Sequence, residues 1–112
     1  MIPVVLSVGN RRVALDASLD TGASSCLFDR MFADELGLDV AGGQRAVFTT
    51  ANSRVEAFGH EVAISVPGIE VHAFVYFFGD DAIKKNVLGW RGWLHRCRIG
   101  IVDYDPPGRR LP

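Results

Sequence analysis

The sequence predicts a mostly β domain, small and barrel-like or sandwich-like, with two short helices. Runs of alternating apolar residues are separated by turn signals such as Gly-Asn and Pro-Gly, and only two stretches have helical spacing. With 112 residues, the chain fits one domain with one hydrophobic core. Hydrophobic residues make up 48% and the formal net charge is -1, which indicates a globular protein rather than a disordered one.

The first third of the chain predicts a hairpin followed by a helix. Strands are expected over 2–8 and 12–19, on either side of a Gly-Asn turn. Side chains alternate along a strand, so Asp20 leaves the sheet on its polar face. The stretch FDRMFADELGLDV is typical of a short helix, with Asp29 as N-cap and Gly37 in the left-handed position that follows. The expected buried stripe of this helix is Phe28, Phe32 and Leu36.

The rest of the chain predicts two further hairpins and a second helix. Four strands are expected around the turns ANS and PG, over 45–50, 54–59, 60–66 and 69–78. A polar loop, GDDAIKKN, then leads to the buried strand VLG. The remaining predicted elements are a helix over 90–96, a strand over 99–104 and a C-terminal tail over 106–112.

Three motifs follow one another in an order that resembles the retropepsin-like aspartic proteases. An Asp-Thr-Gly triplet at residues 20–22 follows an apolar strand and opens into Ala-Ser-Ser. A hairpin, AVFTTANSRVEAFG, comes next, and the apolar pair Val87 and Leu88 with Gly89 then leads into the second helix. The resemblance covers nearly all of residues 2–103 and is to the single-domain members found in retroviruses and bacteria.

The resemblance implies a closed-barrel-like acid-protease fold over residues 1–105, with a flap hairpin. It implies a homodimeric aspartic endopeptidase that needs no cofactor or metal. Asp20 would act on water, Thr21 would link the two active-site loops across the dimer axis, and Gly22 would let the backbone approach an extended peptide or protein substrate. The implied substrate-binding residues are Ala23, Ser24, Thr50, Ala51, Asn52, Ser53, Ile83, Val87 and Trp90.

The chemistry explains why such an enzyme has two copies of the chain. Peptide hydrolysis needs a base to deprotonate water and an acid to protonate the amide nitrogen. Two carboxylates about 3 Å apart repel by roughly 5 kcal/mol at an effective dielectric near 20, so one of them keeps a proton and both roles are filled. Since the chain has one Asp-Thr-Gly, the second carboxylate has to come from another copy, and the monomer is expected to be inert.

Departures from the viral pattern keep a second interpretation open. Viral members often carry an Asp and an Arg where this chain has Ser24 and Trp90, and the flap tip TTANS has no glycine. The alternative is therefore a catalytically silent dimeric module that binds peptides or regulates a partner. A third interpretation, a purely structural β domain with Asp20 as a turn residue, predicts no dimer.

Other candidate residues have simpler interpretations. Asp16 lies four residues before Asp20, about 13 Å along a strand, which is too far for proton sharing. Cys26 with His60 or His72 as base is a weak alternative, because Cys in this context is typically a core residue. His95 and Cys97 face different sides of a helix, so no metal site is expected.

Two aromatic groups are interpreted as core or interface. Trp90 and Trp93 share one helical face, which is typical of core packing. The predicted strand 69–78 is apolar on both faces, so it is either fully buried or meets another subunit on one face.

Composition also restricts partners and location. Basic residues near the C-terminus are offset by aspartates and form no recognised nucleic-acid-binding module, so no nucleic acid is expected. The apolar run 2–8 is too short for a signal peptide or a membrane span, and two cysteines without a secretion signal suggest free thiols. The expected location is therefore cytoplasmic, with no membrane association.

Overall fold

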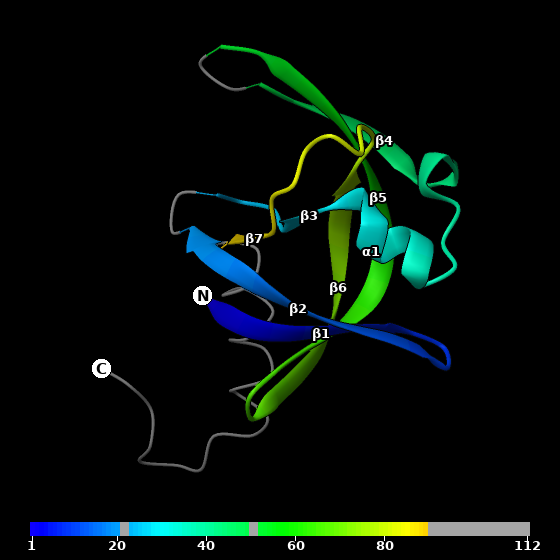
Figure 1. Ribbon diagram of the computed structural model, residues 1–112, viewed down its shortest axis with the longest axis vertical. Coiled ribbons are helices and arrows are strands. Elements are labelled where there is room, and N and C mark those ends of the chain that lie inside the picture. Colours follow the sequence, from blue (N-terminus) through cyan, green and yellow to red (C-terminus); the bar gives the residue numbers. More distant parts are fainter. Residues whose placement is uncertain (21–22, 50–51, 90–112) are drawn as a thin grey trace.

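The computed structural model describes residues 1–20, 23–49 and 52–89, and these form a closed barrel, as predicted (Figure 1). The strands run in the order β1-β2-β7-β3-β6-β5-β4, and a further pairing of β1 with β5 closes the ring and leaves β4 outside it. The elements are β1 (Ile2–Val8), β2 (Arg11–Asp20), β3 (Leu27–Phe28), α1 (Arg30–Glu35), η1 (Val40–Gly42), β4 (Gln44–Thr49), β5 (Arg54–Val66), β6 (Ile69–Phe78) and β7 (Val87–Gly89).

The β1–β2 hairpin forms as the sequence predicts. Gly9 supplies the left-handed conformation of its turn, with φ at 59°. Side chains alternate along both strands, so Val4 and Leu6 of β1 face the interior together with Val13 and Leu15 of β2. Asp16 and Asp20 fall on the opposite, outward face of β2.

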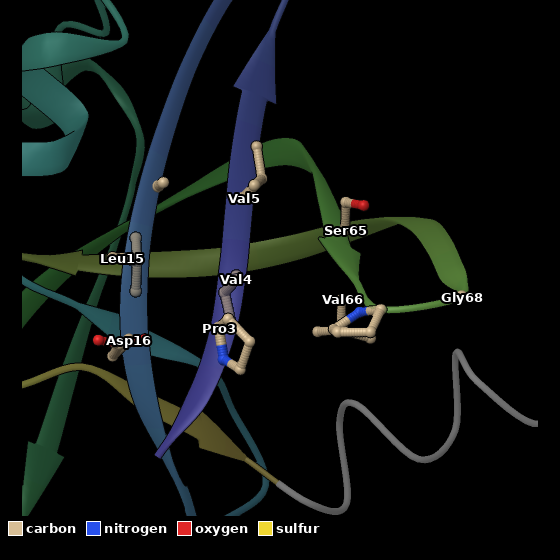
Figure 2. Close-up of a pocket in the computed structure, with 10 residues that line it drawn as sticks. Pro3, Val4, Val5, Leu15, Asp16, Ser65, Val66 and Gly68 are labelled. Carbon is tan, nitrogen blue, oxygen red and sulfur yellow. The ribbon is translucent and has the colours of Figure 1, made fainter.

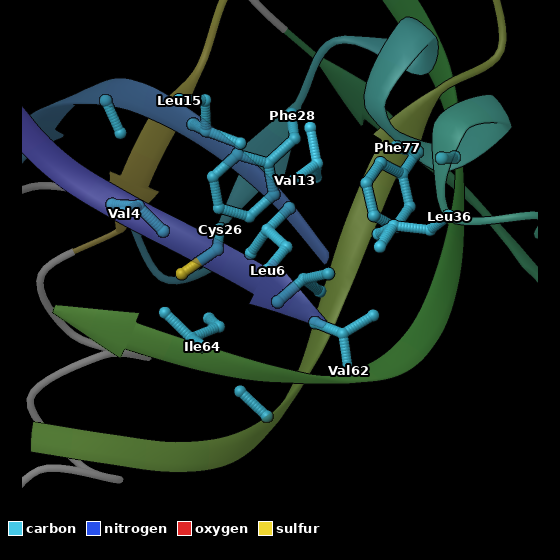
Figure 3. Packing of buried hydrophobic residues seen from close by; sticks show 14 of the residues in the cluster. Val4, Leu6, Val13, Leu15, Cys26, Phe28, Leu36, Val62, Ile64 and Phe77 are labelled. Carbon is cyan, nitrogen blue, oxygen red and sulfur yellow. The ribbon is translucent and has the colours of Figure 1, made fainter. Parts of the chain in front are cut away.

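The hydrophobic core fills the barrel and is closed at one end by α1 (Figure 3). Phe28 of β3 and Phe77 of β6 lie at its centre with their ring centroids 6.1 Å apart, and both are fully buried. Leu6 and Ile64 contribute from β1 and β5. Because one side of each strand is used for this core, the functional residues have to lie on the outer face or at the strand ends.

The helix α1 begins directly after its N-cap residue, Asp29. The Asp29 carboxylate accepts a hydrogen bond from the Met31 N–H at 2.9 Å, and Gly37 has φ at 77° after the last turn, so both predicted ends are confirmed. The prediction that Phe28, Phe32 and Leu36 form the buried stripe of this helix is only partly correct. The helix begins after Asp29, so Phe28 belongs to β3 and not to the helix. Phe28 and Leu36 are buried, whereas Phe32 is partly buried.

Strand β5 corrects the prediction of two separate strands over 54–59 and 60–66. It is continuous and pairs with β6 from Ala57 to Val66. Gly59 does not end the strand; it makes room on the outer face, where an added Cβ would lie 2.4 Å from the Phe74 ring. The predicted Pro-Gly turn is confirmed, with Gly68 at φ 86°.

The remaining differences between prediction and structure concern a short 3-10 helix and the residues after β7. The 3-10 helix η1 was not predicted. The helix over 90–96, the strand over 99–104 and the tail over 106–112 lie outside the described residues. No helix in the described ranges has the length and apolar character needed to cross a membrane.

The outer face of β6 is not fully buried. Phe74 is 36% exposed, and Tyr76 packs edge-on against both Phe74 and Phe48 of β4, with ring centroids 5.4 Å and 5.1 Å apart. Of the two expectations for this strand, full burial is therefore excluded.

We predict that Phe77→Ala lowers the free energy of unfolding by about 3–5 kcal/mol, because it leaves a cavity at the centre of the barrel. Phe74→Ala, on the outer face of the same strand, is the matched control and is expected to cost less, about 1–2 kcal/mol, because Phe74 is partly exposed but packs against Tyr76. Urea denaturation of both variants measures the difference. Equal losses would contradict the assignment of the two faces.

Candidate active site

Asp20 is the last residue of β2, and its position depends on β7. Pairing of β2 with β1 stops at Ala17, whereas residues 18–20 pair in parallel with Val87, Leu88 and Gly89. Asp20 itself is opposite Gly89 and is exposed. Within the described residues, β7 is thus the strand that holds the Asp20 backbone.

Ala23 lies close to the end of β2. The Ala23 N–H donates to the Asp20 carbonyl at 3.2 Å, which returns the chain toward β3. Ala23 is partly buried and Ser24 is exposed. Thr21 and Gly22, the other predicted catalytic residues, lie outside the described residues.

Gly89 has to be a glycine because two backbones cross there. A Cβ at this position would lie 2.2 Å from the carbonyl oxygen of Ser25 and 2.9 Å from its nitrogen. The contact brings the end of β7 against the segment that follows the Asp20 turn. The two sequence motifs, separated by more than sixty positions in the printed sequence, therefore meet in space.

A hollow of about 560 Å³ opens beside Asp20. Asp20 and Val87 are the predicted site residues that line it. It also carries two carboxylates and two ammonium groups, from Asp16, Asp20, Lys84 and Lys85. The Lys84 ammonium lies 3.7 Å from the buried Asp29 carboxylate. The hollow is thus open, mixed in charge and partly apolar.

The outer face of the sheet extends the site beyond the predicted residues. Val87 is opposite Leu27 of β3, and Leu27 is opposite Tyr76 of β6, so the three side chains form a row across the strands. Phe48 continues the row from β4 through its contact with Tyr76. Sequence reasoning missed Leu27, Tyr76 and Phe48; the two-faced apolar pattern of β6 was the signal that could have indicated them.

The β4–β5 hairpin reaches over the side of the barrel on which β2 and β7 end (Figure 1). Asn52 and Ser53, near its tip, are exposed. Thr50 and Ala51 lie outside the described residues, as does Trp90. Ile83 is half-buried and its N–H donates to the Asp80 carbonyl at 3.2 Å, but it does not line the hollow beside Asp20.

The alternative nucleophile has the wrong environment. Cys26 is buried, and this burial raises the pKa of its thiol to about 11, although a hydrogen bond with the Gly89 backbone opposes the shift. The His60 ring contacts the Val40 carbonyl at 3.1 Å, and His72 is exposed. Among the described residues, no group of three or more His, Cys, Asp or Glu side chains is arranged to hold a metal ion.

A second hollow, of about 500 Å³, shares Asp16 with the hollow beside Asp20 (Figure 2). Residues of β1, β2 and the β5–β6 turn line it, including Pro3, Val5, Asp16 and Val66. None of the predicted site residues is among them, so we do not assign it to the active site.

Comparison with known proteins agrees with this geometry. The sequence model of a family described as aspartyl protease matches residues 4–91, a stretch that includes both motifs and the hairpin. A search of curated proteins gives no match.

We predict that Gly89→Ala destabilises the fold by about 3 kcal/mol or more, because its Cβ would overlap the Ser25 backbone. Gly68→Ala is a suitable control: its positive φ imposes a strain of about 1–2 kcal/mol, but the space around it is open. Thermal unfolding compares the two. A smaller loss at Gly89 than at Gly68 would contradict the close crossing.

We also predict that Cys26 resists alkylation in the native protein at pH 7. With the pKa of its thiol at about 11, almost none of the reactive thiolate is present, and the side chain is buried. The measurement is iodoacetamide labelling of a Cys97→Ser variant, with the urea-unfolded variant as positive control. Rapid labelling of Cys26 in the native protein would contradict this prediction and would make Cys26 a candidate nucleophile again.

Proposed function

Because the chain belongs to the aspartyl protease family, we propose that it is a homodimeric aspartic endopeptidase in which Asp20 of each copy acts on the hydrolytic water. The observation that carries the proposal is the position of Asp20. It stands exposed at the end of β2, on a backbone held by the short strand β7. Because Asp20 is exposed, a second copy and a substrate can reach this position.

The proposed mechanism uses the two carboxyl groups as one unit. One is ionised and removes a proton from water, whose oxygen then attacks the carbonyl carbon of the scissile bond. The other holds a proton and donates it to the scissile carbonyl oxygen as the tetrahedral intermediate forms. The proton taken from water then passes to the amide nitrogen as the intermediate breaks down to a free acid and a free amine. Asp16 does not replace the second group, because it lies about 13 Å along the same strand.

The surface beside Asp20 supports association with a second copy. Leu19, the preceding residue, points toward the core side of β2 but is 41% exposed at the end of the strand. Met1 is 83% exposed and, like Leu19, lines the hollow beside Asp20. Apolar side chains exposed next to Asp20 suit a two-fold contact that buries them and brings the two copies of Asp20 together.

The proposed substrate is an extended peptide. The hairpin β4–β5 offers a strand against which a peptide backbone can pair, with Asn52 and Ser53 at its tip. The row of Val87, Leu27 and Tyr76 on the outer face favours apolar side chains near the scissile bond. Ala23, Ser24 and Ile83, with Thr50, Ala51 and Trp90, remain proposed contributors, as do Thr21 and Gly22 in the active-site loop.

The silent dimeric module remains the second candidate. It is favoured by the glycine-free hairpin tip and by Ser24 and Trp90 at the positions where viral members carry an ion pair. The two functions differ in the separation of the Asp20 carboxyl groups in a dimer. A separation of about 3 Å allows proton sharing, whereas a wide gap does not.

We predict that Asp20→Asn lowers peptidase activity by at least about 100-fold, since it removes the general acid and base while keeping the shape of the side chain. Cleavage of denatured protein and of peptide libraries is measured at roughly pH 4 to 6. Undiminished cleavage would exclude Asp20 from the mechanism.

Mixed subunits test the requirement for two copies. When wild-type and Asp20→Asn chains are unfolded together and refolded in equal amounts, about a quarter of the dimers contain two wild-type chains. Activity per total chain is then expected at about a quarter of the wild-type value. A value of about one half, as independent subunits give, would contradict the shared site, and sedimentation checks that dimers form.

A further inference from the structure

Asn86 connects three parts of the molecule just before β7 begins. Its side-chain oxygen accepts a hydrogen bond from the Asp29 N–H at 2.9 Å. Its side-chain nitrogen donates to the Asp16 carbonyl at 3.4 Å, and its backbone carbonyl accepts from the Ser18 N–H at 2.9 Å. The N-terminus of α1 and two positions of β2 therefore meet at one half-buried residue.

The contacts with β2 follow the spacing of a parallel ladder. Ser18 bonds the Asn86 backbone, and Asp16 lies two residues earlier, at the next ladder position. There the side-chain amide of Asn86 donates in place of a backbone N–H. The amide thus extends the pairing of β7 with β2 by one step beyond the three residues of β7.

This extension matters because β7 is short and Asp20 depends on it. Residues 18–20 lie beyond the last partner of β2 in β1, and they pair with Val87, Leu88 and Gly89. A three-residue parallel pair is weakly determined in register, and a slip of one residue would turn its side chains to the other face. The point at which the chain enters β7 therefore decides where Asp20 stands.

A single side chain has to accept one hydrogen bond and donate another at this point. An amide does both through two separate atoms and without changing its protonation, whereas a serine or threonine hydroxyl has one shorter-reaching oxygen for both bonds and glutamine is one methylene longer. The charged residues that bond Asn86 or line the hollow with it are Asp16, Asp20, Asp29, Lys84 and Lys85. Asp16 and Asp29 contact the Asn86 amide through their backbone groups.

We propose that Asn86 is a positioning residue, whose amide fixes the register of β7 against β2 and thereby places Asp20 for catalysis. This role rests on the proposed peptidase function. It predicts that loss of the amide changes turnover more than substrate binding, because Leu27 and Tyr76, which are proposed to hold substrate side chains, stay in place on β3 and β6 while the reacting carboxyl moves. Misplacement by about 1 Å is enough to lower a rate by roughly 100-fold.

The test compares Asn86→Ala with Asp80→Ala at a temperature well below both unfolding transitions. Asp80 lies in the same loop and its carboxylate accepts the Ala82 N–H at 2.9 Å, so its loss removes a similar hydrogen bond that does not touch β2. For Asn86→Ala we expect kcat to fall about 10- to 100-fold with KM within about twofold of wild type. For Asp80→Ala we expect both constants to stay within about twofold.

The nearly isosteric Asn86→Asp variant adds a pH readout. The introduced carboxyl donates to the Asp16 carbonyl only when protonated, and as a carboxylate it faces that oxygen with like partial charge. The ratio of its activity to that of wild type is therefore expected to rise as the pH falls. A ratio that does not change with pH would contradict the role of the donor.

Hydrogen exchange separates this inference from the peptidase function. In Asn86→Ala the amides of Ser18 and Asp20 are expected to exchange faster than in wild type, while those in the middle of the β1–β2 hairpin do not.

Equal kcat losses in Asn86→Ala and Asp80→Ala, or unchanged exchange at Ser18 and Asp20, would overturn the positioning role. A wild-type protein that does not cleave peptides overturns the proposed function, and the exchange data then show independently whether Asn86 fixes the register.

Discussion

The parallel contact between the ends of β2 and β7 is the constraint on which the rest of the site depends. Asp20 has Gly89 as its partner in this pair, and the missing side chain of Gly89 lets the Ser25 backbone lie against it. The end of β2, the segment around Ser25 and the distant strand β7 therefore meet within a few ångströms. Any side chain on Gly89 would separate them and move the acidic residue.

Barrel closure explains why the acidic residue is presented outward. The interior is filled by Phe28, Phe77 and the aliphatic side chains around them, which leaves no room there for a charged group. Alternation along β2 then directs Asp16 and Asp20 to the outer face, where water and substrate reach them. The same division places Val87, Leu27 and Tyr76 on the outer surface as a row.

Much of the fold was predictable because it depends on local chemistry. The turns at Gly9 and Gly68, the N-cap at Asp29 and the alternation in β1 and β2 all follow from neighbouring residues. Tertiary contacts explain the failures. The sequence pattern predicts a strand end at Gly59, whereas the glycine lies within β5 and leaves space for the Phe74 ring of the adjacent strand. The retropepsin-like family was recognised from motifs, whereas the roles of Asn86 and Tyr76 require knowing which strands are neighbours.

Strand β4 has one further consequence for the behaviour of the protein in solution. Within the described part of the chain it pairs with β5 alone, so one row of its backbone groups has no strand beside it. An open row of this kind is the usual starting point for aggregation between molecules. Here the strand is only six residues long and carries Arg45, which pairs with Glu56, so its length and charge limit stacking into fibrils.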